Sequence, residues 1–445
     1  MKKKRIETKA EKTDLLRVRV DELKVGMELS QDLKHFTGRL LLEKDTVLTD
    51  KDIRIIKMWG VTEAVIKNGI RIPSPLEDEK IIRAAIRPIE PFIQEHHKFA
   101  PLSNPVNGEL YRLCLAYHAY SAERTAPAAN LYKPPRKRRK PENMDSVEPF
   151  ADIEEVVERA KLPSLPSIVI RLNEALNNPR CTAVHIADII SKDSNLAVRL
   201  LKLVNSPFYG FPSKITSIAR AVAIIGSRQL STLAIGTVVV SSFKKIPEDF
   251  LNMASFWKHS IAVGLIARFL SSYKRDSNTE NYFLAGMLHD VGRLVIYQNF
   301  PHHAVEILSR AVVEPDLLFR MEKEILGIDH GELGGRLIRK WGLSDVLVNA
   351  CRYHHDPMAS PDPSFASIVH LADIVTIALY FGHSGECYIP TLHQKAWETI
   401  NLPLSVLAPT AIQTGQMLKE TVRNYLPEEF HRDPHGIEAL SEAFG

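Results

Sequence analysis

The sequence FLAGMLHDVGR, residues Phe283–Arg293, places a histidine and an aspartate side by side after an apolar run. The run predicts a buried helix. Adjacent helical side chains point about 100° apart, so His289 and Asp290 can still converge on one metal ion beyond the helix edge. Imidazole nitrogen and carboxylate oxygen are both ligands for Zn, Mn or Fe. The alternative is that His289 only pairs with Asp290 or a backbone carbonyl inside a helical core.

The composition is that of a soluble globular protein. The chain has 445 residues, 45% hydrophobic and 25% charged, with a formal net charge of +4. Its four cysteines form no CxxC pair, which suits a reducing cytoplasm and argues against a disulfide framework or a Cys-based zinc site: Cys114, Cys181, Cys351 and Cys387. No apolar segment follows the basic N-terminus, and Thr399–Leu418 is too polar to span a membrane. We therefore expect a cytoplasmic protein without a membrane span.

The first part of the chain predicts a basic tail and a small module. Residues 1–14 are polar and predict a disordered basic tail. Residues 15–72 predict a small α+β module, because strand-like alternation and hairpin signals are followed by helix-capping signals. We expect a strand from Leu16 to Val20, a hairpin at Leu33–Leu42, a helix from Thr49 to Gly60 and a returning strand at Val61–Lys67. We expect this module to serve in interaction or dimerisation, because it holds no residue with an evident catalytic role.

The remainder of the chain predicts a linker and then a helical domain. Residues 73–146 read as a helical segment followed by a Pro-rich linker around the basic run Arg136–Lys140, which we interpret as solvated. Residues 147–445, with a core at about 153–381, show short amphipathic helices joined by Pro and Gly turns. This pattern predicts an orthogonal all-helical bundle.

Nucleic-acid binding is the weakest functional hypothesis. The stretch Ala183–Gly210 has the appearance of a helix-turn-helix, but its second helix is dominated by apolar positions. Its basic residues, Arg199 and Lys202, are too few for a DNA-reading surface. We therefore expect no nucleic-acid partner.

Several histidines occupy apolar helices or helix ends, where an imidazole is costly unless it is paired or liganded. His370 and Asp373 share one face of the helix expected at about 364–381. Several such histidines in one domain, with Asp290 and Asp373 to balance their charge, fit a metal centre of imidazole and carboxylate ligands. The candidates are His259, His289, His330, His354, His355 and His370.

The order of these residues resembles the HD superfamily of metal-dependent phosphohydrolases. More narrowly, residues 153–381 resemble an HDOD domain, the HD-related output domain of bacterial signalling proteins. The stretches that carry this narrower resemblance are Leu162–Pro166 (LPSLP), Ser194–Gly210 (SNLAVRLLKLVNSPFYG), Ala221–Gly226 (AVAIIG) and His330–His355 (HGELGGRLIRKWGLSDVLVNACRYHH). Residues 15–72 resemble the small module that precedes some HD-GYP and HDOD domains. The resemblance implies a mainly α, HD-type bundle behind a small α+β module.

The resemblance also implies the ligands of a divalent transition metal, Fe, Mn or Zn. His259 matches the first motif histidine, and His289 with Asp290 matches the HD pair. The next motif histidine, the double histidine and the closing aspartate are matched by His330, His354, His355 and Asp373.

Departures from the HD-GYP phosphodiesterases bear on catalysis. Asp356–Ser360 stands where those enzymes carry Gly-Tyr-Pro, and Arg293 stands where they carry a phosphate-binding Lys.

One hypothesis is a signalling output protein that relays a signal through protein contacts or a nucleotide or phosphate ligand, with a homodimer left open. The alternative is a metal-dependent phosphohydrolase of a nucleotide or cyclic nucleotide, in which Asp290 and Arg293 would be catalytic and Arg293 would hold a phosphate oxygen.

Overall fold

The chain divides into two units, Met1–Glu77 and Asp78–Gly445. The computed structural model describes residues 15–20, 23–34, 40–49, 52–53, 56, 61, 63–67, 90–124, 150, 152–178, 180–206, 209, 211, 213–243, 246, 251–274, 276 and 278–426. The tail at 1–14 and the basic run Arg136–Lys140 lie outside these residues. Their disorder and solvation therefore stay predictions.

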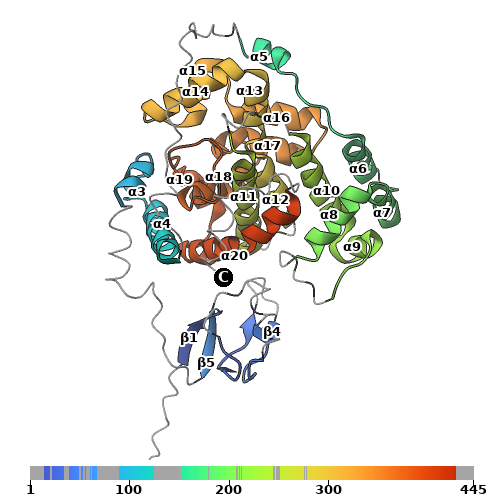
Figure 1. Cartoon of the computed structure of the whole chain (residues 1–445), viewed down its shortest axis with the longest axis vertical. Coiled ribbons are helices and arrows are strands. Elements are labelled where there is room, and N and C mark those ends of the chain that lie inside the picture. Colours follow the sequence, from blue (N-terminus) through green and yellow to red (C-terminus); the bar gives the residue numbers. More distant parts are fainter. Residues whose placement is uncertain are drawn as a thin grey trace, which may run out of the picture. The chain divides into compact units, whose positions relative to one another are not determined.

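The N-terminal unit forms two small antiparallel sheets in its described part (Figure 1). The first has the order β1-β5-β2 and the second pairs β3 with β4: β1 (Leu15–Arg19), β2 (Glu28–Leu29), β3 (Leu33–Lys34), β4 (Leu40–Leu42) and β5 (Glu63–Lys67). Val18 pairs with Ala64 in register, and both side chains are buried in the core of the unit. The expected hairpin and returning strand are confirmed.

The helix expected after Thr49 begins with the predicted cap. The Asp52 carboxylate accepts a hydrogen bond from the backbone N–H of Thr49 at 3.0 Å, and the Thr49 hydroxyl accepts one from the N–H of Asp52 at 3.3 Å. This reciprocal pair satisfies N–H groups that the first turn of a helix leaves free. The expected stop at Gly60 lies outside the described residues.

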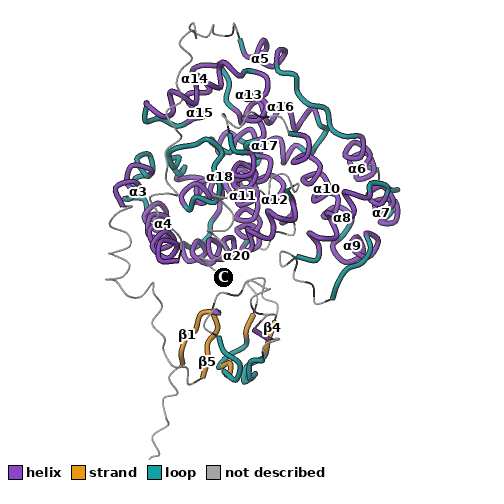
Figure 2. The backbone as a smooth tube through the Cα atoms, viewed as in Figure 1, coloured by secondary structure: helices purple, strands orange, loops and turns teal. Residues whose placement is uncertain are grey.

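The second unit is helical throughout its described part, and strands occur only in the N-terminal unit there (Figure 2). Its helices are α3 (Glu90–His96), α4 (Pro105–Arg124), α5 (Ile153–Arg159), α6 (Ser167–Asn177), α7 (Ala183–Ser191), α8 (Ser194–Val204), α9 (Ile218–Ile225), α10 (Ser227–Ser242), α11 (Met253–Tyr273), α12 (Thr279–Leu288), α13 (Val291–Asn299), α14 (Pro301–Val313), α15 (Leu318–Leu326), α16 (His330–Lys340), α17 (Asp345–Tyr353), η3 (Pro357–Ala359), α18 (Pro363–Ala378), α19 (Gln394–Ile400), η4 (Leu404–Val406) and α20 (Leu407–Tyr425). The expected fold class, an all-helical bundle behind a small strand-containing module, is confirmed.

Helix α11 is the centre of this bundle. It packs most extensively against α12 and α18, and α17 lies against both of these (Figure 1). Its side chains are buried along nearly the whole length, including Trp257 and Phe256. Such all-round burial is expected only of a helix that is enclosed by others. Within the described residues, no single helix combines the length and apolarity that a membrane crossing requires.

Short polar caps set the helix boundaries in the first half of the bundle. Asp193 accepts from the N–H of Leu196 at 3.0 Å and starts α8, and Ser217 accepts from the N–H of Arg220 at 3.2 Å and starts α9. The start of α9 is therefore Ile218. Likewise, α6 begins at Ser167, after the prolines of Leu162–Pro166, because a proline supplies no N–H within a helix.

Helices α3 and α4 belong to the helical unit, although the sequence groups them with the linker. The backbone N–H of Ile389 donates to the carbonyl of His96 at 2.9 Å, and Thr391 Oγ1 donates to the carbonyl of Phe99 at 2.6 Å. Helix α4 packs against α18 and α20. The segment 90–124 thus covers the C-terminal half of the bundle.

Candidate metal centre

The structure brings every metal ligand that the resemblance implies to one place in the middle of the bundle. His259 lies on α11, and His289 with Asp290 occupies the junction between α12 and α13. The remaining ligands come from the first residue of α16, the end of α17 and the middle of α18: His330, His354, His355 and Asp373. All of these side chains are buried except that of His355, which is partly exposed.

His289 and Asp290 do not share one helix, which corrects the expectation. Helix α12 ends at Leu288, His289 is its C-cap, and Asp290 is the residue that precedes α13. The change of direction between the two helices turns both side chains toward the centre. An uninterrupted helix would instead separate them by about 100°.

One group of ligands surrounds His289. Its Nε2 lies 3.4 Å from His259 Nε2, 3.4 Å from Asp290 Oδ2 and 3.5 Å from Asp373 Oδ1. The Nε2 of His259 lies 3.2 Å from the same Asp373 oxygen. Asp373 Oδ1 is buried and accepts no hydrogen bond from the described protein. A buried carboxylate oxygen that lies close to two imidazole nitrogens, with no contact of hydrogen-bond geometry, fits a cation site.

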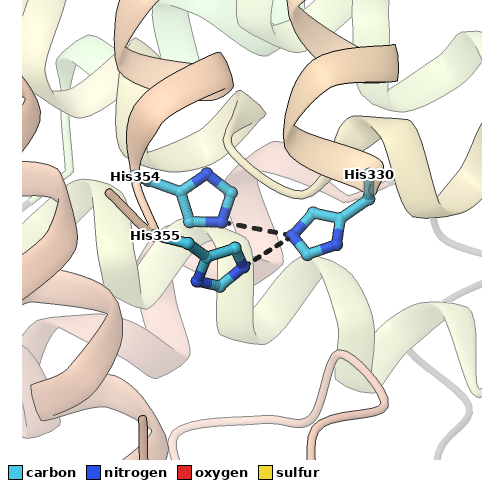
Figure 3. A group of neighbouring side chains, drawn as sticks. All are labelled: His330, His354 and His355. Carbon is cyan, nitrogen blue, oxygen red and sulfur yellow. Dashed lines mark hydrogen bonds between the residues drawn. The ribbon is translucent and has the colours of Figure 1, made fainter. Parts of the chain in front are cut away.

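A second group surrounds His330. Its Nε2 lies 3.2 Å from His354 Nε2 and 3.1 Å from His355 Nε2 (Figure 3). It also lies 2.9 Å from Asp290 Oδ1. Asp290 therefore presents Oδ2 to the first group and Oδ1 to the second. The carboxylate can bridge two ions, or serve one ion in either group.

The imidazoles are oriented so that their Nε2 atoms face inward. His289 Nδ1 donates to the carbonyl of Gly286 at 2.6 Å, His354 Nδ1 donates to the carbonyl of Cys351 at 2.6 Å, and His330 Nδ1 donates to Glu322 Oε2 at 2.5 Å. These acceptors fix the proton on Nδ1 and leave an Nε2 lone pair in neutral imidazole. Lone pairs that point at one another repel unless a cation or a proton lies between them. The donor set therefore fits a divalent transition metal.

Glycines at helix crossings make this convergence sterically feasible. A Cβ on Gly286 of α12 would lie 2.6 Å from the backbone N of Gly264 on α11, the helix that carries His259. A Cβ on Gly292 of α13 would lie 1.9 Å from the carbonyl oxygen of His330, and one on Gly382 would lie 2.3 Å from the N of His259. Only a residue without a Cβ permits backbones to approach so closely.

In metal-free protein, the buried carboxylates favour protonation of two of the histidines that would bind an ion. Burial opposes the charge on His289, but the carboxylates of Asp290 and Asp373 outweigh it and raise the pKa to about 10. Burial and Arg293 likewise oppose the charge on His330, yet Glu322 and Asp290 raise its pKa to about 9. Burial lowers the pKa of His354 to about 3. Metal-free protein at neutral pH thus holds cationic His289 and His330 beside neutral His354.

Arg293 does not have the position expected of a phosphate contact. Arg293 is 1% exposed, and its guanidinium faces acceptors of the protein itself. Nη1 donates to Asp290 Oδ2 at 3.3 Å and to Ser384 Oγ at 2.7 Å, and Nε lies 3.3 Å from Glu322 Oε1. Arg293 thus holds the carboxylate that joins the two ligand groups. A phosphate could reach it only by displacing these partners.

Sequence reasoning missed Glu322, which positions His330. Besides its bond to the ring, the Glu322 carboxylate accepts the backbone N–H of His330 at 2.9 Å. The available signal was its place in α15, because Glu322 falls four residues from both Leu318 and Leu326 on the buried face. A carboxylate within an apolar stripe indicates a buried partner.

His370 is excluded from the ligands by its hydrogen bonds. Its Nδ1 donates to the carbonyl of His354 at 2.7 Å, and its Nε2 accepts the N–H of His393 at 3.1 Å. With both ring nitrogens satisfied by backbone, His370 ties α18 to the end of α17. It thereby supports the double histidine without facing the centre.

Comparison with known proteins identifies the helical part. Residues 162–357 match the family model of the HDOD domain. The chain carries an HDOD domain. The match includes the ligands from His259 to His355, and Asp373 lies beyond its end. The recognition made from the sequence is thus confirmed.

Individual relatives of the chain are distant. An uncharacterized protein of Treponema pallidum is 25% identical over 266 residues, 59% of this chain and 48% of the relative. This chain therefore spans about half of that protein's length. A structure from Shewanella amazonensis, provisionally named a phosphohydrolase, is 24% identical with a TM-score of 0.45 and covers 66% of this chain and 99% of its own. One from Marinobacter aquaeolei, provisionally named a signal transduction protein, is 21% identical with a TM-score of 0.49 and covers 64% of this chain and 62% of its own.

Proposed function

We propose that the chain is a bacterial signal-transduction output protein whose HDOD domain binds a divalent transition metal and relays a signal through a protein or ligand contact. One observation carries the proposal. The metal ligands converge, but the guanidinium of Arg293, which would have to bind a substrate phosphate, is already bound to groups of the protein. Arg293 is held by Asp290, Ser384 and Glu322. A bound ion would complete a buried network of charged side chains that stabilises one conformation of the domain.

The loop after the double histidine also supports the relay function. Residues Pro357–Ala359 form a short 3-10 helix, and Pro363 opens α18. Prolines fix φ and remove backbone donors, so this loop offers few N–H groups to a phosphodiester. Orientation of a phosphodiester for attack is a large part of such catalysis. A signalling protein, or a nucleotide or phosphate ligand bound without turnover, is therefore the proposed partner, and the chain can act as a homodimer.

A metal-dependent phosphohydrolase is the second candidate, favoured by the bridging position of Asp290. When bound, a divalent ion there supplies Lewis-acid polarisation of a phosphate. His355 is the ligand that is partly exposed, and its ring stacks on Phe319 with centroids 4.1 Å apart. We expect a substrate to approach the centre past His355. Asp290 would then hold the metal that acts on it.

The deciding experiment combines elemental analysis with a turnover screen. Full-length protein loaded with Mn or Fe is assayed on nucleotides and cyclic dinucleotides, including cyclic di-GMP. We expect near-stoichiometric metal that is lost in His289→Ala while the helical circular dichroism spectrum is kept, and negligible turnover of cyclic di-GMP. Rapid metal-dependent hydrolysis that Asp290→Ala abolishes would refute the relay function and establish the phosphohydrolase. Repeatedly metal-free protein would refute both.

A further inference from the structure

The loop between α18 and α19, residues 379–393, contacts the guanidinium of Arg293 on its inner side. Ser384 accepts from Arg293 Nη1 through both its hydroxyl, at 2.7 Å, and its carbonyl, at 3.3 Å. The Glu386 carboxylate lies 3.9 Å from Arg293 Nη2. Glu386 also accepts backbone N–H groups from Leu318, Cys387 and Tyr388 at 2.9, 2.9 and 3.2 Å. The inner side of the loop is therefore held by the same arginine that holds Asp290.

The outer side of the same loop binds helix α3. His96 Nδ1 donates to the carbonyl of Cys387, and the N–H of Ile389 donates to the carbonyl of His96. The His96 ring stacks on Tyr380 with centroids 4.5 Å apart, and Tyr388 meets Phe99 edge-on at 5.4 Å. Cys387 directly follows Glu386 in the chain. One residue step thus separates the contact with Arg293 from the contact with α3.

The backbone of the loop is constrained at three residues close to Ser384 and Glu386. Gly382 and Gly385 have φ of +90° and +112°, and Tyr380 has φ of +54°. A Cβ at Gly382 would overlap the backbone of α11, and one at Gly385 would lie 3.0 Å from the hydroxyl oxygen of Tyr297. A loop with such constraints transmits a displacement of Ser384 and Glu386 because little of it can absorb the movement.

We propose that the state of the metal centre controls the docking of α3 through Arg293 and the α18–α19 loop. The guanidinium is shared between Asp290 on one side and Ser384 with Glu386 on the other. When the Asp290 carboxylate is committed to an ion, its attraction for Arg293 weakens and the guanidinium is held more firmly by the loop. In metal-free protein Asp290 draws Arg293 away, and the support beneath Cys387 and Ile389 loosens.

The inference rests on the proposed metal-dependent function and supplies its regulation. Helix α3 is the first described helix after the N-terminal unit, so its docking is a change that can be passed toward that unit along the chain. Allosteric coupling requires two sites whose states bias each other. Here the two sites are the ligand cluster around Asp290 and the contact between α3 and the loop.

Hydrogen–deuterium exchange of the full-length chain tests the proposal. Amide exchange at residues 93–100 is measured in protein loaded with Mn²⁺ and in chelated protein, with metal content measured on the same samples. We expect chelation to accelerate exchange in this segment on the order of tenfold, a typical size for an allosteric coupling. Exchange at α7 and α9, which carry none of the metal ligands and no part of the α18–α19 loop, serves as the internal reference.

Two variants separate coupling from simple destabilisation. Glu386→Gln keeps an oxygen for the backbone N–H groups but cannot ionise. Because burial raises the pKa of Glu386 to about 7, the comparison is made at about pH 8, where the variant removes the charge that attracts Arg293. The variant should retain metal while exchange at 93–100 loses most of its metal dependence. His96→Ala should retain metal and exchange fast at 93–100 in both states. Glu314→Gln, a change of the same kind at an exposed carboxylate paired with Arg310, should behave as wild type.

The outcomes distinguish this inference from the function on which it rests. Wild-type protein that gains and loses metal with unchanged exchange at 93–100 refutes the coupling and leaves the metal centre standing. Full metal dependence in Glu386→Gln also refutes the route through Arg293. Protein that binds no metal refutes the coupling together with the proposed function.

Discussion

Substitution of Gly292 by alanine should open the metal centre without removing any ligand. The added Cβ would lie 1.9 Å from the carbonyl oxygen of His330 and 2.7 Å from the N of Gly334, both backbone atoms. Ordinary contact begins near 3.4 Å, so α13 and α16 must separate by about 1.5 Å. Metal–ligand distances tolerate only about 0.2 Å. The movement would carry His330 away from Asp290, whose Oδ1 now lies 2.9 Å from its Nε2.

The stability effect follows from overpacking against a backbone that cannot rotate away. Such insertions cost about 1–3 kcal/mol, and we expect Gly292→Ala near the upper end of that range. Urea unfolding of chelated protein measures this cost, and elemental analysis of metal-loaded protein measures the lost site. Gly108→Ala in α4 is the matched control, because its Cβ would meet a nearest atom at 3.3 Å and needs only a slight adjustment. Wild-type stability with full metal content in Gly292→Ala would show that the α13–α16 crossing does not position the ligands.

The remaining predictions concern protons and the support of His330. Metal must displace the protons of His289 and His330, whose pKa values are raised to about 10 and about 9, so metal affinity should rise with pH and level off only above these values. Calorimetry in buffers of different ionisation enthalpy should show proton release on binding, and a pH-independent affinity would contradict this account. Glu322→Gln should weaken metal binding about 10–100-fold, because the uncharged amide is a poorer acceptor for His330 Nδ1, and competition with a chelator of known affinity measures the loss. Unchanged affinity would assign Glu322 a purely structural role.

The ligands could be predicted from the sequence because their positions are constrained by helices. His259, His330 and Asp373 all lie in segments whose apolar spacing marks them as helical, and a histidine or aspartate there needs a partner. The resemblance to HD proteins then supplied the order of the ligands. The hairpin and returning strand of the N-terminal unit were likewise evident, because Gly-containing turns separate short alternating runs.

Other parts of the centre depend on contacts that a pattern does not reveal. The break between His289 and Asp290 carries no proline, and the run from Phe283 to Arg293 reads as one helix. The role of Gly292 follows from the approach of α16, a helix that begins thirty-eight residues later at His330. The partners of Arg293 come from α15 and from the α18–α19 loop, whose positions are set by tertiary packing. The sequence pattern together with its resemblance to HD proteins therefore identified the ligands, but not the residues that hold them.

The charges of the centre explain why those supporting residues matter. Three buried carboxylates, Asp290, Glu322 and Glu386, lie within 4 Å of the guanidinium of Arg293. A fourth, Asp373, is buried beside His259 and His289. Buried charges of one sign are tolerated only when they are neutralised. In metal-free protein the protons on His289 and His330 contribute to this neutralisation, with pKa values raised above the ordinary 6.5. Their stabilisation is complete below the ordinary pKa and is lost as the pH rises through about 9 and 10. A divalent ion replaces those protons with a charge that does not titrate, so the centre links metal to stability through the same groups that link it to Arg293.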